Sequence, residues 1–341
     1  MKVLVTGATG FLGSAVVAAT LAAGHEVVAL RRPSAPAPAT DSTGQLSWLA
    51  ADLRQPGNLS NHLKEIEGVI HCAATTSGDL ATQLAGTVVA TENLLACVPQ
   101  RLQRFVHVSS LSVYDFDNPR FLGLLSEETA LERRPLRRDA YTQTKLIQER
   151  LVRDFARSEQ IPLVLARPGA IYGRTKTWDY GRGLAVKGLD LIFAPLARMR
   201  LIHVDNCADA LVAALTAPID GELVVNLVDS EQPSHWRFHA LARRAGAPTG
   251  LGVPVPYAAV LGIGLAARLA SWLFFKGRAR LPEFLDPPRQ RVRWRPLRYA
   301  RDRAQNILGT RQRVSLQQGL AEMNLPPEAA IDATIWPVGE T

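Results

Sequence analysis

The chain begins with a glycine-rich turn set between a strand-like segment and a helix-like segment. Lys2–Thr6 is short, apolar and rich in β-branched residues, and residues 14–23 have the composition of a helix. Between them stand Gly7, Gly10 and Gly13, at three-residue spacing. Glycine permits backbone angles that a side chain opposes, and it lets another group approach the backbone closely. Because the N–H groups at the start of a helix carry positive partial charge, this arrangement predicts a dinucleotide site with the pyrophosphate on the turn.

Strand-like and helix-like segments alternate through the first half of the chain, which predicts a parallel sheet with helices on both faces. The expected strands are residues 2–6, 26–30, 46–50, 68–71, 104–109 and 162–167, with 222–228 returning to the sheet later. The expected helices are residues 14–23, 59–64, 83–98 and 140–158. We therefore expect an α/β fold, a doubly wound parallel sheet of the Rossmann type with a smaller, mostly helical substrate lobe.

The alternation stops near residue 173, and prolines become common beyond it. Within the first part, residues 33–44 are rich in Pro, Ala, Ser and Thr, which predicts a loop. The expected organisation is a dinucleotide-binding domain of residues 1–173 and 202–229, a substrate lobe of 174–201 and 230–330, and a tail of 331–341.

The composition is typical of a globular protein, since 47% of the 341 residues are hydrophobic and 21% are charged. Cys72, Cys97 and Cys207 are far apart and lack metal-binding spacing, which favours buried thiols in a reducing compartment. His235 and His239 have helical spacing but no nearby carboxylate, so no metal site is expected. Because the chain opens directly on a strand, we expect no signal peptide and a cytoplasmic location.

The net charge of +8 is uneven, because arginines gather over residues 268–313. This stretch is not a recognisable nucleic-acid module with interleaved aromatic residues, so a solvated surface is favoured and no nucleic acid is expected. Tyr257–Phe275 is almost entirely apolar, with Arg268 inside it. A lid or wall helix over the substrate site is favoured there, and a peripheral lipid contact is the alternative. An integral membrane span is not expected, because the stretch is rich in Gly and Ala and holds a central charge.

Tyr141 and Lys145 stand four residues apart at the start of an expected helix, which places both side chains on one face. An ammonium beside a phenol favours the phenolate and lowers the pKa of the tyrosine. Such a tyrosine can exchange a proton with a substrate hydroxyl while hydride moves to or from a nicotinamide. The pair follows a serine-rich strand end, residues 107–114, and serines there face the ligand crevice of a parallel sheet. We therefore predict that Tyr141 and Lys145 are catalytic.

These motifs resemble the extended short-chain dehydrogenase/reductase family, which includes nucleotide-sugar epimerases and 3β-hydroxysteroid-dehydrogenase-like enzymes. Similar landmarks are Ala51-Asp52-Leu53, His71-Cys-Ala-Ala74, Arg167-Pro-Gly-Ala-Ile-Tyr-Gly173 and residues 201–210. The resemblance implies that the Asp52 carboxylate binds the adenine amino group. It implies a cofactor site made of Gly7, Thr9, Gly10, Phe11, Leu12, Arg31, Arg32, Asp52, Leu53, Ala73, Ala74, Tyr141, Lys145 and Pro168.

The same resemblance implies the catalytic serine. Matching Val113-Tyr114 to the family's Ser-Ser-x-x-Val-Tyr element assigns this role to Ser110, with Ser109 and Ser112 as alternatives. The interval from Ser110 to Tyr141 is longer than is usual in the family, which implies an insertion over residues 116–138 near the mouth of the site. Thr87 stands where an asparagine is common, so the role of that position is open.

The second strand ends in Arg31 and Arg32, where the family usually has an acidic residue that binds ribose hydroxyls. An arginine cannot accept hydrogen bonds from hydroxyls, but it pairs well with a 2′-phosphate. We therefore expect NADP(H) to be favoured, with NAD(H) as the alternative.

The leading interpretation is an NADP(H)-dependent oxidoreductase that interconverts a secondary alcohol and a ketone, with reduction favoured if the cofactor is NADPH. A nucleotide-sugar epimerase or dehydratase-type enzyme is the alternative, and Arg182, Arg200 and Arg237 could then bind the diphosphate. A non-catalytic nucleotide-binding sensor is the third interpretation, disfavoured because Tyr141 and Lys145 are both present. The resemblance also implies a homodimer formed through helices 83–98 and 140–158.

Overall fold

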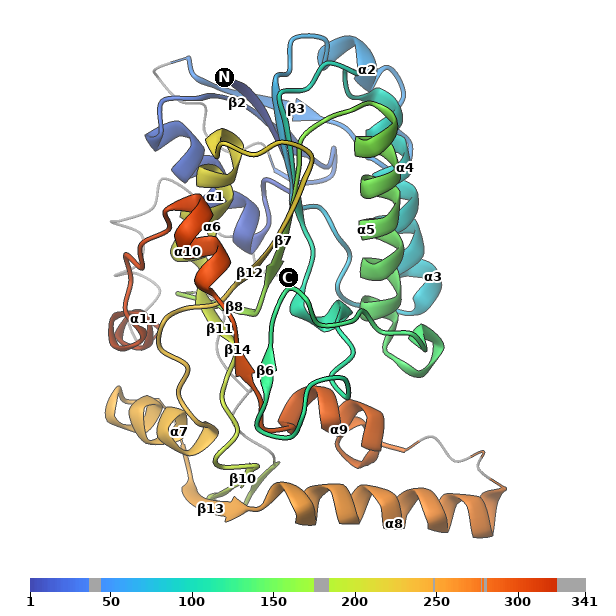
Figure 1. Ribbon diagram of the computed structural model, residues 1–341, viewed down its shortest axis with the longest axis vertical. Helices are drawn as coiled ribbons and strands as arrows, with labels where there is room; N and C mark the ends of the chain where they lie inside the picture. The colour runs from blue at the N-terminus through green and yellow to red at the C-terminus, as the bar shows by residue number, and fades with distance from the viewer. Residues whose placement is uncertain (37–43, 175–183, 248, 277, 279–280, 324–341) are drawn as a thin grey trace.

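A parallel sheet of seven strands, in the order β12-β7-β5-β4-β1-β2-β3, forms the centre of the molecule (Figure 1). The computed structural model describes residues 1–36, 44–174, 184–247, 249–276, 278 and 281–323, and the expected tail lies outside them. The strands are β1 (Lys2–Thr6), β2 (Glu26–Arg31), β3 (Leu46–Ala50), β4 (Gly68–His71), β5 (Arg104–Val108), β7 (Leu163–Pro168) and β12 (Glu222–Leu227). The prediction of a doubly wound parallel sheet is confirmed, with strand ends within about one residue of those expected.

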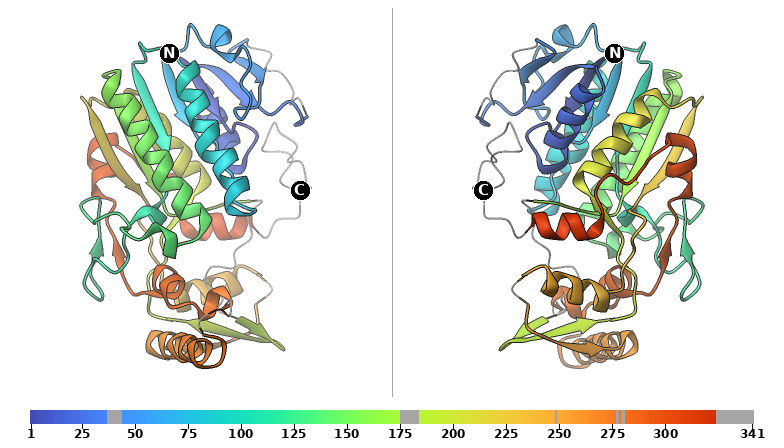
Figure 2. Two further views of the ribbon diagram at one scale, coloured as in Figure 1. Left: turned by 90° about the vertical axis from the view of Figure 1, so that its right-hand side faces the viewer. Right: turned by 90° about the vertical axis from the view of Figure 1, so that its left-hand side faces the viewer.

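Helices cover both faces of this sheet (Figure 2). On one face lie α1 (Phe11–Ala22) and α6 (Val204–Thr216), and on the other lie α4 (Ala90–Cys97) and α5 (Ala140–Ser158). The side chains of β1 alternate between the two cores, because successive residues of a strand point to opposite faces. Val3 and Val5 pack with α1 and α6, whereas Leu4 packs with α4 and α5. This double burial explains the continuous apolar character of the strands.

The strand order reverses between β1 and β4, since β2 and β3 continue on one side of β1 and the later strands on the other. The crevice outside the carboxyl ends of the strands at such a reversal is where ligands bind in open α/β sheets. The glycine turn follows β1, and residues 72–74 follow β4. The topology therefore brings two stretches of the predicted cofactor site to the same crevice.

The helix expected over residues 83–98 is interrupted by a π-helical turn. It consists of α3 (Leu80–Gln83), a π-helix over Leu84–Val89, and α4. The π-turn lies against residue 75: Thr87 Oγ1 accepts a hydrogen bond from Thr75 N at 3.0 Å. A side chain at Gly86 would collide with the Thr75 hydroxyl. Thr87 stands at the position where an asparagine is common in the family. Its hydroxyl holds the backbone at Thr75, just after β4.

The segment expected to be an insertion, 116–138, is tied to a distant part of the chain. Its short strand β6 (Leu124–Leu125) pairs in parallel with β14 (Arg298–Tyr299). A similar pair joins β8 (Ala170–Tyr172) to β11 (Leu201–His203). The remaining short elements near the sheet are α2 (Leu59–His62), the 3-10 turns η2 (Leu111–Val113) and η3 (Pro135–Arg137), α10 (Asp302–Leu308) and α11 (Leu316–Glu322).

The smaller lobe lies beyond the carboxyl ends of the sheet strands, at the lower end of Figure 1. It carries the expected helices together with a small sheet, β13-β10-β9, that the sequence did not predict. Strand β9 of this sheet has only three residues, and β13 contains a glycine and a proline, residues that favour a loop in a sequence pattern. The elements of the lobe are β9 (Leu184–Val186), β10 (Leu189–Phe193), α7 (His235–Arg244), β13 (Leu251–Val255), α8 (Tyr257–Phe275), η4 (Glu283–Leu285) and α9 (Pro287–Trp294).

Candidate active site

The glycine turn forms a tight cradle between β1 and the chain that leaves β4. Gly7 has a φ of +65°, and a Cβ added to it would lie 3.0 Å from both N and Cα of Ala73. A Cβ on Gly13 would collide with the carbonyl oxygen of Gly7. Gly10 caps α1 and has no side chain that could occupy the start of the helix. The turn thus leaves the positive end of α1 open to an anionic group.

Thr6 and His71 fix the ends of β1 and β4 to each other. Thr6 Oγ1 lies 2.7 Å from His71 Nδ1 and accepts a hydrogen bond from Ala73 N at 3.2 Å. Burial, together with the smaller effect of the Lys145 ammonium, lowers the pKa of His71 to about 3. His71 is therefore a neutral structural group, and Ala73 and Ala74 follow it at the edge of the crevice.

The helix α5 begins at Ala140, just before the predicted catalytic pair Tyr141 and Lys145. Asp139 caps it, since its side chain accepts a hydrogen bond from Thr142 N at 2.8 Å. Tyr141 and Lys145 therefore lie on the first turns of α5, with Tyr141 half-buried and Lys145 only 2% exposed. The Lys145 ammonium donates to the Val108 carbonyl at 2.8 Å, at the carboxyl end of β5. This contact ties the helix to the strand end that carries the serines.

A buried polar network surrounds the ammonium of Lys145. Gln148 Oε1 accepts a hydrogen bond from Lys145 Nζ at 2.9 Å, and Gln148 Nε2 donates to Thr91 Oγ1 at 2.8 Å. The same amide nitrogen lies 3.1 Å from His71 Nε2. Burial lowers the pKa of Lys145 to about 8, because the interior disfavours its charged form. Sequence analysis missed Gln148 and Thr91, although the three-residue spacing from Lys145 to Gln148 on a helix was a usable signal.

The predicted serine lies on the turn against which α5 packs. Ser110 caps the 3-10 turn η2, and its Oγ accepts a hydrogen bond from Ser112 N at 3.1 Å. Ser109 is buried at 1% exposure. Arg138, just before α5, donates to the Ser112 carbonyl at 3.0 Å and so links the turn to the helix. Ser110 is partly exposed, unlike Ser109, and because its Oγ accepts the bond from Ser112 N its own proton can be donated to a ligand.

The predicted adenosine end of the site contains opposite charges. Arg31 ends β2, and its guanidinium donates to the Ala35 carbonyl at 2.9 Å. Its Nε is buried and has no hydrogen-bond partner among the described residues. Asp52 is held by Arg54, whose Nε lies 3.0 Å from each carboxylate oxygen. This hydrogen bonding from Arg54 lowers the pKa of Asp52, and the charge of Arg32 lowers it further.

An ion pair is buried beneath the predicted nicotinamide end. Pro168 closes β7, and the preceding Arg167 donates to Glu149 through Nε at 2.8 Å and NH2 at 2.7 Å. Both side chains are at most 2% exposed. Although burial raises the pKa of Glu149, the hydrogen bonds and charge of Arg167 outweigh this and hold it below its usual value. Arg167 also stacks over the ring of Tyr114 at 4.6 Å, so it anchors η2 as well as α5.

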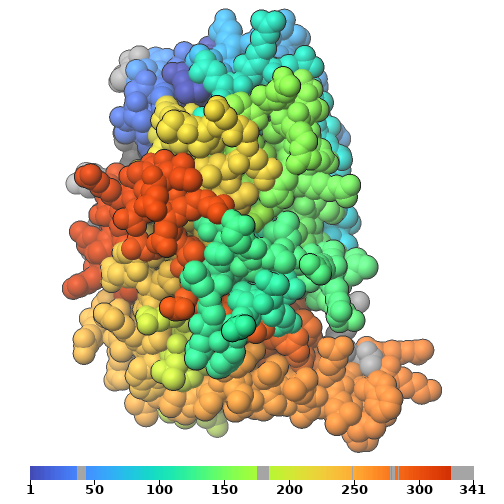
Figure 3. All heavy atoms as spheres, in the orientation of Figure 1, coloured from blue at the N-terminus to red at the C-terminus, as the bar shows by residue number. Residues whose placement is uncertain are grey.

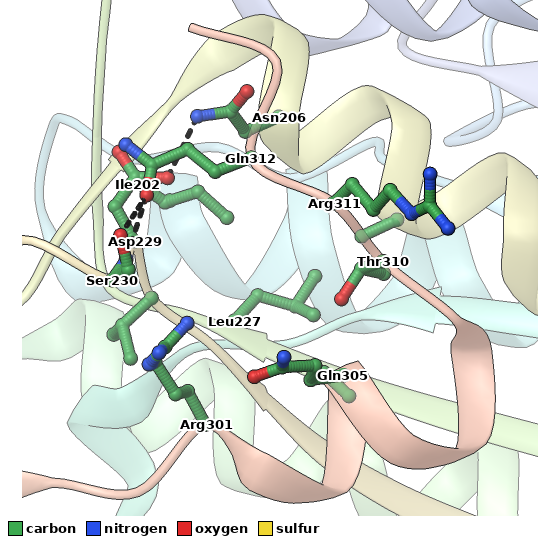
Figure 4. A pocket seen from close by; sticks show the side chains of 13 residues that line it. Ile202, Asn206, Leu227, Asp229, Ser230, Arg301, Gln305, Thr310, Arg311 and Gln312 are labelled. Atoms are coloured by element: carbon green, nitrogen blue, oxygen red, sulfur yellow. Dashed lines mark hydrogen bonds between the residues drawn. The ribbon is translucent and has the colours of Figure 1, made fainter. Parts of the chain in front are cut away.

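A separate small pocket lies where residues 301–312 cross α6 and the end of β12 (Figure 4). Its polar side is built around Asp229, whose Oδ1 accepts a hydrogen bond from Asn206 Nδ2 at 2.8 Å. Burial raises the pKa of Asp229 to about 6. None of the predicted cofactor or catalytic residues lines this pocket, so it is distinct from the crevice at β1 and β4.

The histidines of α7 are buried structural groups. His235 Nδ1 lies 2.9 Å from the Phe193 carbonyl, and His239 Nε2 lies 3.0 Å from the Asp190 carboxylate. The expectation of no carboxylate near this pair was wrong, because Asp190 is distant in sequence and reaches α7 through β10. In the part of the chain that the structure describes, no three metal-binding side chains cluster. Cys207 is buried as expected, whereas Cys72 and Cys97 are partly exposed.

Three comparisons relate the chain to known proteins. The model of the NAD dependent epimerase/dehydratase family matches residues 3–227. The 2-alkyl-3-oxoalkanoate reductase of Stenotrophomonas maltophilia (strain K279a) is 26% identical and covers 95% of this chain and 98% of its own length. An uncharacterized UDP-glucose epimerase of Bacillus subtilis (strain 168) is 28% identical, over 69% of this chain and 78% of that protein. The crystal structure of UDP-glucuronic acid 4-epimerase from Bacillus cereus in complex with NAD has a TM-score of 0.68. It is 23% identical over 94% of this chain and 97% of that chain, a likeness of fold.

Proposed function

Because the chain belongs to the NAD-dependent epimerase/dehydratase family, we propose that it is an NADP(H)-dependent enzyme that interconverts a ketone and a secondary alcohol. The observation that carries the proposal is the contact between the Lys145 ammonium and the Val108 carbonyl. It fixes the helix of Tyr141 and Lys145 against the strand end that leads to Ser110. These are the groups needed to move a proton to and from a substrate oxygen.

The residues around the glycine turn fit a dinucleotide. The close approach of Gly7 to Ala73 leaves room for no side chain at the turn, and Gly10 leaves the start of α1 uncovered. Arg31, Arg32 and Asp52 would hold the adenosine part of the cofactor. The position of Arg31 at the end of β2 supports the preference for NADP(H), since it places a guanidinium beside the proposed adenosine site. A 2′-phosphate is the group that a guanidinium pairs with best there.

When bound, the nicotinamide dinucleotide supplies hydride to the carbonyl carbon, or accepts it in the reverse direction. Tyr141 donates its phenolic proton to the carbonyl oxygen as the ketone becomes an alcohol. The positive charge of Lys145 lowers the free energy of the phenolate that remains. Ser110 donates a hydrogen bond to the same oxygen and orients it, because its Oγ already accepts from Ser112 N. The proton then returns to Tyr141 from water.

We propose a ketone rather than a sugar nucleotide as substrate. The reductase of Stenotrophomonas maltophilia, which the chain matches over almost its whole length, is named for a 3-oxoalkanoate. One arginine that could bind a diphosphate is already engaged, since Arg200 donates to the Val292 carbonyl at 2.8 Å and stacks over Phe116 at 4.9 Å. Arg237 lies exposed on α7, and Arg182 lies outside the described residues. A nucleotide-sugar epimerase remains the second candidate, because the B. subtilis relative is named as one.

We also propose a homodimer formed through residues 83–98 and 140–158. Val89 and Ile147, one in each of these stretches, are 41% and 40% exposed. Apolar side chains of this kind are what a partner would cover.

We propose that the protein acts in the cytoplasm.

The test is a parallel titration of the purified protein with NADPH and NADH, followed by nicotinamide fluorescence. We expect NADPH to bind more tightly, and NADPH to be consumed with 3-oxoalkanoates and other ketones. Tyr141→Phe should retain NADPH affinity and lose turnover at least about 100-fold. A preference for NADH, or NAD retained through purification, would favour the epimerase. A Tyr141→Phe variant with unchanged turnover would contradict the assigned chemistry.

A further inference from the structure

The long helix α8 turns its large apolar side chains to solvent and its small ones to the protein. It packs on η4 and α9 through a narrow strip that includes Val260, Gly264 and Ser271, all of which are buried. The opposite arrangement, with large side chains inside, is the usual one for a helix on a soluble protein. On α8, the residues 49–78% exposed are Ile263, Leu265, Leu269, Trp272, Leu273, Phe274 and Phe275.

This orientation is fixed by one buried side chain. Gln290 of α9 is fully buried, and its Nε2 donates to the Val260 carbonyl of α8 at 2.9 Å and to the Phe284 carbonyl at 2.8 Å. A Cβ on Gly264 would lie 2.5 Å from both Nε2 and Oε1 of the same amide. Glycine is therefore needed where Gln290 meets the helix. The helix is held flat, with its apolar face directed away from the protein.

The side of α8 opposite Gly264 contains no charged residue. Arg268, the only charged residue of the helix, is exposed, but it stands four residues after Gly264 and so lies at the border of the packed strip. Residues 262, 266, 269 and 273 lie on the opposite side of the helix, and they are Gly, Ala, Leu and Leu. A surface of this width without charge is typical of an interaction site.

The segment that carries α8 is also the most positive part of the chain. Residues 232–300 contain twelve Lys or Arg and two Asp or Glu, a net charge of +10, whereas the whole chain has +8. Lys276 ends α8 with its side chain exposed, and Arg278 follows it. Figures 1 and 3 show α8 along the end of the molecule farthest from β2 and β3. An uncharged apolar face therefore sits at the tip of a strongly positive lobe.

We propose that α8 is a membrane-docking helix that lies in the plane of an anionic bilayer, with Leu269, Trp272 and Leu273 among the acyl chains. The apolar face matches the lipid interior, and the arginine-rich lobe matches the negative headgroups. A second copy of this chain matches less well, because an α8-to-α8 contact would bring together two copies of the 232–300 segment, each with a net charge of +10. By length and composition the helix could cross a bilayer, but its packing on Gln290 holds it flat against the lobe. Docking would bring the enzyme to substrates dissolved in lipid.

The experiment is flotation of the purified full-length protein with lipid vesicles, either phosphatidylcholine alone or phosphatidylcholine mixed with phosphatidylglycerol. We expect binding to the anionic vesicles that weakens as salt is raised. Leu269→Gln/Leu273→Gln should reduce the partition coefficient roughly tenfold or more, because both side chains would leave the acyl region. Leu136→Gln, at a residue 87% exposed on η3 and outside the lobe, is the matched control and should bind like the parent protein.

Two further measurements separate the possible outcomes. NADPH binding and thermal unfolding of the double variant should equal those of the parent, because neither leucine is buried. Part of the tryptophan fluorescence should be quenched by lipids brominated on their acyl chains, and this quenching should be smaller in Trp272→Tyr. The proposal is overturned if anionic vesicles do not bind the protein, or if the double variant binds as well as Leu136→Gln. It is also overturned if the double variant only converts a dimer to a monomer in lipid-free solution.

Discussion

The Lys145 ammonium donates to Gln148 Oε1 at 2.9 Å, one turn further along α5. The amide oxygen of Gln148 stabilises the charged form of the buried ammonium. It therefore keeps the pKa of Lys145 from falling further. The other bonds of Gln148, to Thr91 and near His71, fix the direction of its amide. Gln148 is thus a positioning residue for the proposed catalytic lysine.

The pH dependence of kcat/KM should report the charge of Lys145. Its pKa in the free enzyme is lowered to about 8, so the ammonium is present below that pH and lost above it. We therefore expect kcat/KM for NADPH to fall as pH rises through about 8, since kcat/KM for the first substrate to bind follows ionisations of the free enzyme. In Gln148→Leu, the same fall should begin at lower pH, because the charged form has lost an acceptor. Gln143→Leu, on the same helix, is the control and should leave the profile in place.

Arg31 should determine which cofactor binds. In Arg31→Ser, the affinity for NADPH should fall about 10- to 100-fold, because a charge-assisted hydrogen bond to the 2′-phosphate is lost, while NADH affinity changes little. Fluorescence titration with both cofactors measures the ratio. Arg101→Ser, an exposed arginine before β5, tests for a general charge effect and should change neither affinity. Equal losses for NADPH and NADH in Arg31→Ser would show that the side chain serves only the local fold.

The buried pair Glu149–Arg167 should be needed for stability. Arg167→Met leaves the buried Glu149 carboxylate without its bidentate partner, although Arg153 remains 3.2 Å from it. We expect this change to lower the free energy of unfolding by about 3–5 kcal/mol, and Arg167→Met/Glu149→Leu to recover part of that loss. Urea unfolding at neutral pH measures both variants. A double variant less stable than Arg167→Met would contradict the view that the loss comes from the unpaired carboxylate.

The π-turn should tolerate no side chain at Gly86. Its Cβ would collide with the Thr75 hydroxyl, and Thr75 is the residue that Thr87 braces after β4. We expect Gly86→Ala to lower the midpoint of thermal unfolding and to weaken cofactor binding, since the 71–75 segment borders the crevice. Gly262→Ala in α8 is the matched control, because nothing lies within 4 Å of the added Cβ. It should raise stability by about 0.5–1 kcal/mol, as is usual for this change within a helix.

The sheet could be predicted from sequence because its strands are buried on both faces. Such strands, β1 and β5 among them, are continuous apolar runs, and the glycine turn marks the start of the first helix. The placement of Tyr141 and Lys145 could be predicted for a similar reason. A helix of nineteen residues with an Asp cap gives a clear periodic pattern.

The rest depended on contacts between residues far apart in the chain. Gln148 and His71 are in contact although 77 residues separate them in the sequence. Asp190 and His239 are in contact across 49 residues. No local sequence pattern predicts either contact. The β13-β10-β9 sheet was missed because Leu184–Val186 is too short for a periodicity. The apolar stretch of α8 was found, but a lid or wall helix was favoured for it. Only the packing on Gln290 reveals that its large side chains face outward.

The pairing of β6 with β14 has a mechanical consequence for how substrates are admitted. The chain passes between the sheet and the lobe after β8, after β10, after β12 and after α9, and the pairing adds a cross-link between segments 174 residues apart. A hinge between the two parts would have to bend all of these connections together and break the strand pair. We therefore expect the lobe and the sheet to move as one body, so that a substrate is selected by its fit to a preformed site rather than by closure around it.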